Sequence, residues 1–318
     1  MTRSARALYA LLVLMIVLTA CTSDPGSRPR SDSDSSASGS SAPQDSASPE
    51  TTGAPRTGTP TASSGSEPSG NGQPGTFEQL VALFGGGVSP KSSGTFGLDR
   101  WTLIPTGTGV PGDSAVRVEY PKGSASPAAS RDYGSPGGGM QVYLTVDGQR
   151  PSDAYLRYWV RFPADFDFVR GGKLPGLFGG TKVSGGDKPD GTDGFSTRLM
   201  WRTKGAGEVY LYAPHKSGKS LGRGSWTWPR GTWTCVEQHV QLNTPGEKDG
   251  SVTVWLNGKQ VLTEQKILYR TVDSLRIDGI FFSTFYGGDN PGWAPSQDEH
   301  ADFAGFALSP RPIGCGSG

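Results

Sequence analysis

Residues 195–214 read FSTRLMWRTKGAGEVYLYAP, and this stretch decides what the rest of the chain can be. Two runs of residues that alternate with a period of two flank a glycine-containing turn at residues 203–207, a pattern that predicts a β-hairpin. One face of this hairpin is mostly apolar and suits a hydrophobic core. Its members are Phe195, Thr197, Leu199 and Trp201, followed by Val209, Leu211 and Ala213.

The opposite face, called the polar face below, carries Ser196, Arg198, Met200, Arg202, Glu208, Tyr210 and Tyr212. Symmetric closure of the turn predicts three cross-strand pairs, which are Arg202 with Glu208, Met200 with Tyr210, and Arg198 with Tyr212. Such a face fits two interpretations. It is either the solvent side of an ordinary antiparallel strand or a reaction surface, on which arginine lowers the free-energy cost of ionising a nearby phenol.

The first 21 residues are typical of a targeting segment. Arg3 and Arg6 precede an apolar run at residues 7–18 that is short for a membrane span. The sequence Leu-Thr-Ala-Cys at residues 18–21 resembles the lipobox of bacterial lipoproteins. That resemblance implies cleavage before Cys21, lipidation of its thiol and an extracellular protein anchored to the cell membrane. An ordinary signal peptide with an incidental cysteine is the alternative.

Composition divides the remaining chain into two parts. Residues 22–75 contain no aromatic residue and consist mainly of Ser, Gly, Pro, Thr, Ala and Asp, so we expect a disordered tether. Residues 76–318 hold all eight tryptophans and are long enough for one sizeable domain. The formal net charge of +1 argues against a nucleic-acid partner, because no basic stripe is available to neutralise phosphates. We expect the domain to act as a monomer.

The domain reads as strand and turn after a short opening helix, for which Thr76 and Gln79 predict a capping box. Asn257-Gly258 between two Val-rich runs predicts a two-residue hairpin turn. The expected strands are residues 115–120, 140–146, 155–162, 195–202, 208–213, 232–242, 251–257, 259–263, 274–285 and 301–308. Many short strands without a long helix predict an all-β fold, an antiparallel β-sandwich or jelly roll of the concanavalin-like type, whose concave face can bind a long polymer.

Cysteines, histidines and acids narrow the chemistry. Cys235 and Cys315 form an even pair in an exported domain, which favours a disulfide over two buried thiols. The three histidines are dispersed, and no spacing suggests a zinc site. Few acids lie on the expected strands, which disfavours hydrolysis by paired carboxylates.

No cofactor is expected, although one glycine-rich loop is acidic. The loop at residues 179–194 contains Asp187, Asp190 and Asp193. Carboxylate oxygens could hold a structural calcium there, whereas acidic turns without a metal are common.

A basic segment precedes this loop, with Lys173 set among glycines at residues 171–180. Taken alone, a lysine in such a loop is more often solvated than functional. An ordered series of motifs nevertheless resembles polysaccharide lyase family 14 and the related glucuronan lyases of family 20. The motifs are YWVRFP at 158–163, GKLPG at 172–176, FSTR at 195–198, EVYLY at 208–212 and the segment 281–306.

The resemblance implies a β-jelly-roll enzyme that cleaves uronate polysaccharides, glucuronan or alginate-like, by β-elimination. It assigns site roles to Lys173, Ser196, Arg198, Tyr210 and Tyr212. Arg198 and Lys173 would neutralise the uronate carboxylate, a tyrosine would move the protons, and Ser196 would orient the substrate. Which tyrosine is the base stays open.

Two further points stay open at this level. Trp293 could line a sugar subsite or cap the edge of the sandwich. The rival function is a non-catalytic carbohydrate-binding domain that uses the same concave face. Retention of the tyrosines with Arg198 and Lys173 favours the enzyme, because binding alone needs no base.

Overall fold

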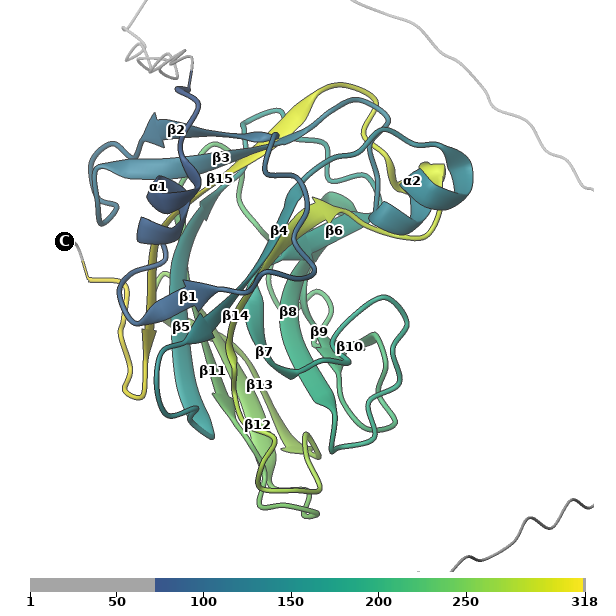
Figure 1. The fold of residues 1–318 in the computed structure, drawn as a ribbon. Coiled ribbons are helices and arrows are strands. Elements are labelled where there is room, and N and C mark those ends of the chain that lie inside the picture. The colour runs from purple at the N-terminus through teal and green to yellow at the C-terminus, as the bar shows by residue number, and fades with distance from the viewer. Residues whose placement is uncertain (1–71, 317–318) are drawn as a thin grey trace, which may run out of the picture. The chain divides into compact units, whose positions relative to one another are not determined.

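The computed structural model describes residues 72–316, all of which belong to one compact unit. Two sheets pack face to face as a sandwich (Figure 1). The eight-stranded sheet has the order β1-β4-β14-β6-β8-β9-β10, and β7 pairs with β14 and β8 beside this path. Its strands are β1 (Val88–Pro90), β4 (Met140–Val146), β6 (Gly171–Leu174), β7 (Gly176–Gly180), β8 (Gly194–Arg202), β9 (Gly207–Tyr212), β10 (Lys219–Leu221) and β14 (Gly279–Tyr286).

The seven-stranded sheet has the order β13-β12-β11-β5-β15-β3-β2. Its strands are β2 (Trp101–Pro105), β3 (Ser114–Tyr120), β5 (Asp153–Arg161), β11 (Thr234–Gln241), β12 (Gly250–Leu256), β13 (Lys259–Ile267) and β15 (Glu299–Ser309). All pairings between these strands are antiparallel. The predicted fold class, an all-β antiparallel sandwich, is therefore confirmed.

Helices are short in the described part of the chain. α1 (Phe77–Ala82) has the predicted capping box, because the Gln79 amide donates to the Thr76 hydroxyl and the Gln79 side chain accepts from the Thr76 amide. α2 (Pro127–Tyr133), which we did not expect, is capped by Ser126. Two 3₁₀ turns are η1 (Thr203–Gly205) and η2 (Pro291–Trp293). No helix within residues 72–316 is long and apolar enough to span a bilayer.

The sequence pattern located ten of the strands and missed five, which are β1, β2, β6, β7 and β10. β6 and β7 are rich in glycine, which has low strand propensity, so their pattern resembles a loop. The glycines are needed because neighbouring groups approach very closely. A Cβ on Gly172 would lie 2.0 Å from the Trp201 ring, and one on Gly176 would lie 2.3 Å from the Thr197 carbonyl oxygen. Tertiary packing, and not local strand propensity, therefore makes β6 and β7 strands.

The core between the sheets contains the predicted apolar face of the hairpin. Phe195, Leu199, Trp201, Val209 and Leu211 are all fully buried. The Trp201 indole N–H donates to the Phe168 carbonyl at 3.2 Å, so burying this large side chain leaves no unpaired donor. Burial of each such side chain stabilises the fold by roughly 1.5–3 kcal/mol. The strand alternation thus directs the polar face away from the core.

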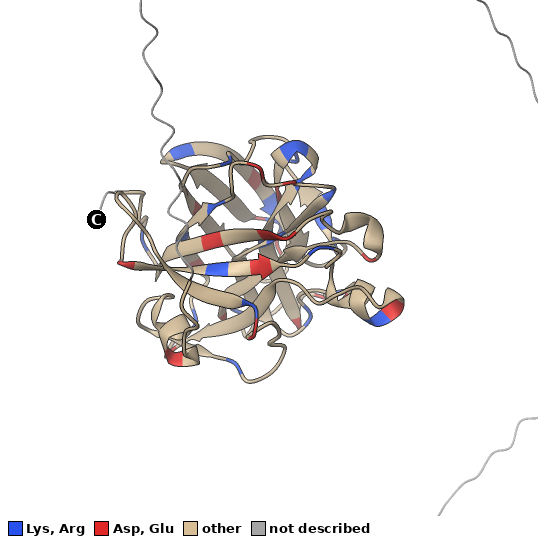
Figure 2. Cartoon of the chain, turned by 90° about the horizontal axis from the view of Figure 1, so that it is seen from above, with Lys and Arg blue, Asp and Glu red and all other residues tan. Residues whose placement is uncertain are grey.

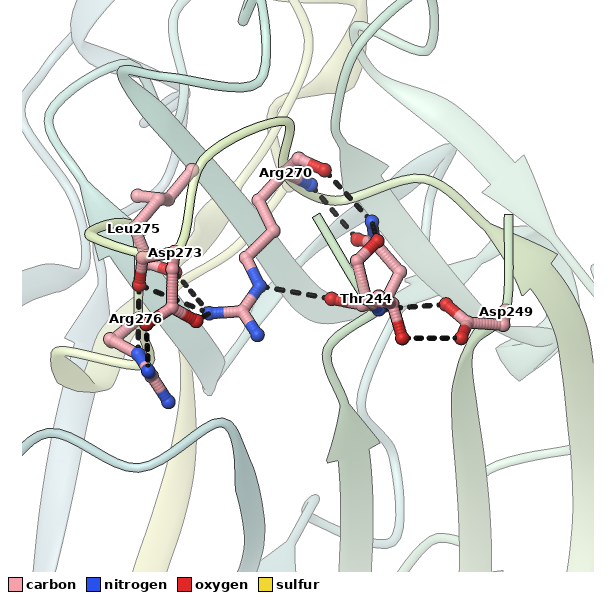
Figure 3. Close-up of polar contacts among 7 residues, drawn as sticks. Thr244, Asp249, Arg270, Asp273, Leu275 and Arg276 are labelled. Carbon is pink, nitrogen blue, oxygen red and sulfur yellow. Dashed lines mark hydrogen bonds and ion pairs between the residues drawn. The ribbon is translucent and has the colours of Figure 1, made fainter. Parts of the chain in front are cut away.

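Two loops at one end of the sandwich are joined by Arg270, which is buried (Figure 3). Its guanidinium donates to the carbonyl oxygens of Asn243, Asp273 and Leu275, and so bridges the β11–β12 loop and the β13–β14 connection. The backbone of Thr271, the next residue, donates to the Gly191 carbonyl at 2.8 Å. This end of the molecule therefore supports the acidic loop that follows β7.

The C-terminal tail is fastened to the seven-stranded sheet. Cys235 on β11 forms a disulfide with Cys315, as predicted. The backbone amides of Ile313 and Gly314 donate to the Glu237 carboxylate. At the other end, Gln73 forms a bridge with Leu103, so regular structure begins three residues before Thr76, the expected start of the domain.

Charged residues are mixed over this unit, with Lys and Arg interspersed among Asp and Glu (Figure 2). That distribution agrees with the small net charge of the chain. The predicted lipidation site Cys21, the targeting segment and nearly all of the tether lie outside the described residues.

Candidate active site

The hairpin β8–β9 forms, but its register differs from the predicted one by two residues. Arg198 pairs with Tyr210, Ser196 with Tyr212 and Met200 with Glu208. The predicted pairs were wrong because the turn closes earlier: the Arg202 amide donates to the Ala206 carbonyl at 2.7 Å around a three-residue 3₁₀ turn. Lys204 and Gly205 both have positive φ, which makes this tight turn possible. A shift of two preserves which face each side chain occupies.

Lys173 lies on strand β6 and not in the loop that the sequence suggested. It pairs with Met200 on β8 and with Phe285 on β14. This register turns its side chain toward the polar face, where Nζ lies 4.0 Å from the centroid of the Tyr210 ring and 3.2 Å from the Met200 sulfur. Burial, and then the nearby cations Arg198 and Arg202, hold the pKa of Lys173 well below its ordinary value, against the opposing effect of Glu208.

Arg198 is buried at the centre of the polar face. Its guanidinium carbon lies 4.5 Å from the Phe281 ring centroid, and Nη1 donates to the Ser283 hydroxyl at 3.2 Å. That hydroxyl in turn donates to Gln141 Oε1 at 2.9 Å. The Nε of Arg198 is buried without a hydrogen-bond partner among the described residues. A buried cationic donor that is not satisfied internally is suited to an anionic ligand.

Tyr210 and Tyr212 lie side by side, with ring centroids 5.6 Å apart. Burial raises the pKa of Tyr210 to about 12, with smaller contributions from electrostatic repulsion by Tyr212 and from a hydrogen bond with Tyr212. The positive charges of Arg198 and Arg202 oppose the rise. The Tyr212 hydroxyl also accepts a hydrogen bond from the Gly186 amide at 3.2 Å. At neutral pH Tyr210 therefore keeps its proton and can act as a donor.

Ser196 is fully buried, and its hydroxyl donates to the Val183 carbonyl at 2.6 Å. Together with the contact between Tyr212 and Gly186, this bond attaches the acidic loop to the polar face. In this structure the Ser196 hydroxyl is thus engaged with the loop.

Trp293 is brought to the rim of the polar face by η2. Its ring centroid lies 5.7 Å from the guanidinium carbon of Arg202 and also 5.7 Å from that of Arg170. Arg202 is itself held by Glu208. The tryptophan is half-buried, so part of its ring stays accessible.

The structure adds residues that sequence reasoning missed. Tyr143 stacks on Phe281 with centroids 4.3 Å apart, and burial raises its pKa while Arg198 and a Ser184 hydrogen bond oppose this. Gln141 and Ser283 support Arg198 from β4 and β14. The alternation of side chains along β4 and β14 would have grouped Gln141, Tyr143 and Ser283 with Arg198. That inference needed knowledge of which strands lie side by side in the sheet.

The three acidic loop residues are each engaged in contacts within the loop. Asp187 accepts from the amides of Val183 and Ser184, Asp190 accepts from Thr192, and Asp193 pairs with Lys182. Within residues 72–316, no group of three or more His, Cys, Asp or Glu side chains has an arrangement that could hold a metal ion. The calcium hypothesis therefore gains no support from the described residues.

Two pockets of about 360 and 330 Å³ lie elsewhere and share Arg117 in their linings. Arg117 and Arg161 both bind the buried carboxylate of Asp302, so both of these arginines already have an acidic partner in the fold. Neither pocket includes a predicted site residue.

The polar face thus combines groups whose proton affinities are displaced in opposite directions. Lys173 gives up its proton more readily than an ordinary lysine, and Tyr210 holds its proton more tightly than an ordinary tyrosine. Arg198 supplies a positive charge that acts on both of them. Such an arrangement can remove one proton, deliver another and stabilise a negative charge.

Comparison with known proteins identifies the family of the chain. Residues 109–306 match the family described as polysaccharide lyase 14. A structure of the PL-14 alginate lyase from Aplysia kurodai is similar with a TM-score of 0.60 and 30% identity, covering 71% of this chain and 91% of that one.

A second structure is of an alginate lyase, Aly36B, with a lysine and a tyrosine replaced by alanine, in complex with an alginate tetrasaccharide. It is similar with a TM-score of 0.56 and 26% identity, covering 68% of this chain and 85% of that one. Exolysin of Paramecium bursaria Chlorella virus 1 is 27% identical over 198 residues, 48% of this chain. The match spans only 29% of the exolysin chain.

Proposed function

The chain belongs to polysaccharide lyase family 14, and on that premise we propose that it cleaves a uronate-containing polysaccharide by β-elimination on the polar face. The observation that carries this proposal is the convergence of Lys173, Arg198 and Tyr210 from three strands around one point of the eight-stranded sheet. Alginate is the first substrate to test, because the similar structures are described as alginate lyases, and glucuronan is the second.

The reaction removes the proton from C5 of a uronate, breaks the bond between C4 and O4, and leaves a C4–C5 double bond. Arg198 binds the carboxylate next to C5 and stabilises the negative charge that develops there. Its unpartnered Nε supports this role.

The environments of Lys173 and Tyr210 support separate proton-transfer roles, a base and an acid. The sequence-based expectation instead gave proton transfer to a tyrosine and gave Lys173 the role of neutralising the carboxylate. Lys173, with its lowered pKa, takes the C5 proton as a neutral amine. Tyr210, with its raised pKa, gives its proton to the departing O4. Tyr212, whose ring centroid lies 5.6 Å from that of Tyr210, packs beside it and helps to position it. Ser196 acts through the loop that it anchors.

The test is to incubate the purified protein with alginate, its mannuronate-rich and guluronate-rich fractions, and glucuronan. We expect ultraviolet absorbance from the conjugated double bond and oligosaccharides that are lighter by one water than hydrolysis products. A Tyr210→Phe preparation serves as the control for contaminating lyases. Saturated products would identify a hydrolase and overturn the proposal.

We also propose that the protein is exported and anchored to the cell membrane through a lipid on Cys21. The support is the lipobox-like sequence and the Ser/Gly/Pro-rich stretch that follows it. Such an anchor would hold the lyase where an extracellular polymer can reach it.

A further inference from the structure

A row of alternating cations and aromatic rings extends from the reaction centre to the rim of the polar face. Lys173 lies 4.0 Å from the Tyr210 ring, and the Arg202 guanidinium carbon lies 5.8 Å from that same ring. Beyond Arg202, the Trp293 ring is 5.7 Å away and Arg170 lies a further 5.7 Å from that ring. The row is continuous, although its members come from four separate parts of the chain.

Glu208 fixes the inner part of this row. Its carboxylate is fully buried; Oε1 accepts from Nε and Nη2 of Arg202 at 2.8 and 2.5 Å, and Oε2 accepts from Arg223 at 2.7 Å. These short bonds to a buried carboxylate constrain Arg202 to one orientation. Two arginines, Arg202 and Arg170, lie against Trp293, and only Arg202 of these two is paired with Glu208 among the ion pairs of the described residues.

The outer part of the row remains accessible. Arg170 is exposed and Trp293 is half-buried. Glycines shape this part, because a Cβ on Gly288 would lie 2.0 Å from the Trp293 indole nitrogen and one on Gly292 would lie 3.1 Å from Arg170 Nη1. An exposed arginine placed over a tryptophan offers a guanidinium fork for a carboxylate beside a flat apolar surface.

We propose that Arg202, Trp293 and Arg170 form a further uronate subsite, in which the arginines bind the carboxylate of a sugar beyond the scissile bond while Trp293 stacks on a sugar ring. Glu208 is the positioning residue for Arg202. This proposal rests on the proposed function, since it names how the same polymer is held outside the reaction centre. The guanidiniums of Arg202 and Arg170, both against the Trp293 ring, complement a polymer that carries one carboxylate per sugar.

The subsite is tested with Arg170→Ala, Arg170→Lys and Trp293→Ala, because these partly or fully exposed positions can change without leaving an unpaired buried group. Arg311→Ala is the control; it removes an exposed arginine of the C-terminal tail. Kinetics are measured on long polymer and on uronate oligosaccharides of increasing length. We expect Arg170→Ala to raise KM on long substrates about tenfold, the value of one charge-assisted contact, and to lower kcat much less. The effect should disappear for substrates too short to reach the subsite, and Arg170→Lys should restore part of the loss.

Binding is measured separately by calorimetry, with uronate hexasaccharides titrated into Tyr210→Phe protein and into the same protein carrying Arg170→Ala. If unsaturated products form but KM, its length dependence and hexasaccharide affinity are unchanged in both Arg170→Ala and Trp293→Ala, the subsite proposal fails while the lyase proposal stands. If no unsaturated product forms, yet the hexasaccharides bind more weakly to the Arg170→Ala protein, the subsite stands and the lyase proposal fails. Absence of hexasaccharide binding to both proteins overturns the subsite.

Discussion

The environment of Lys173 disfavours the positive charge that a lysine normally carries. Its ammonium group is buried beside two arginines, and only Glu208 opposes the resulting fall in its pKa. A lowered pKa does not help a cation whose only role is to neutralise a carboxylate, because it reduces the fraction of the group that is charged. A base does gain from it, because a neutral amine becomes available closer to physiological pH.

Lys173→Arg therefore separates the two roles. Arginine keeps the positive charge but cannot release its proton, so we expect turnover to fall by about 10²-fold or more. In the wild-type protein kcat/KM should rise with pH as Lys173 loses its proton, with a midpoint below about 10.4, the ordinary lysine value.

The kinetic measurement is a pH profile of both proteins, with Lys259→Arg, at an exposed position of β13, as the control. If Lys173→Arg retains wild-type turnover, the lysine is a carboxylate ligand and the base lies elsewhere on the polar face.

Tyr210→Phe removes the hydroxyl whose pKa is raised to about 12 and leaves the ring on which Lys173 packs. We expect kcat to fall by about 10²-fold or more with the fold and substrate affinity largely kept, whereas Tyr212→Phe should cost only about tenfold. Single-turnover kinetics and circular dichroism of both variants provide the measurement. Equal losses in the two variants would assign proton transfer to the pair and not to Tyr210.

At the scale of elements, the hairpin and the acidic loop act as one unit. Ser196 on β8 and Tyr212 on β9 are cross-strand partners on the polar face. Ser196 forms a hydrogen bond to Val183 of the loop, and Tyr212 forms one to Gly186. The loop is in turn supported from the far side by Thr271. A polymer lying on the polar face would meet this loop at one end and Trp293 at the other.

Ser196→Ala should loosen this loop. The lost hydrogen bond is worth roughly 1 kcal/mol, and we expect faster amide hydrogen exchange in residues 183–187 together with a higher KM. Ser89→Ala on β1, where the hydroxyl donates to Asp147, is the matched control. Unchanged exchange combined with lost turnover would mean that Ser196 acts on the substrate directly.

At the scale of the molecule, the two sheets have different tasks. The eight-stranded sheet carries the polar face, and the seven-stranded sheet carries the disulfide and the buried ion pairs around Asp302. The disulfide and the ion pairs around Asp302 thus lie on the sheet that does not carry the polar face. A change in the fastening of the tail should alter stability without altering the reaction.

Cys315→Ser tests this separation. Loss of the bond to Cys235, which closes a loop with a sequence separation of 80, should lower the free energy of unfolding by about 2–5 kcal/mol. Denaturant unfolding with and without reductant measures the effect, and turnover well below the unfolding temperature should match the wild type. An unfolding midpoint equal to that of the wild type would show that the Glu237 contacts alone hold the tail.

Cys21→Ser tests the proposed anchor. Without a thiol to carry the lipid, the protein should appear in the soluble fraction or remain unprocessed, whereas wild-type protein should partition into detergent. Membrane fractionation and mass spectrometry of the mature N-terminus are the measurements. A variant that stays in the membrane and is cleaved normally would contradict the lipoprotein proposal.

The sequence alone determined what depends on neighbouring residues. The capping box at Thr76, the Asn257-Gly258 turn and the division of the β8–β9 hairpin into an apolar and a polar face all follow from local geometry, and each is found in the structure. The face of each residue survived a wrong register because side chains repeat every two residues and the register error was also two. The motif series likewise identified the family before the fold was known.

Tertiary structure alone decided the chemistry within that face. The glycines of β6 read as a loop, and only packing against Trp201 and pairing with β8 and β14 made that segment a strand that buries Lys173. Burial and neighbouring charges then set the proton affinities of Lys173 and Tyr210, which no local pattern encodes. Trp293 meets Arg202 and Arg170 for the same reason, since contacts between distant segments are fixed by how the sheets pack.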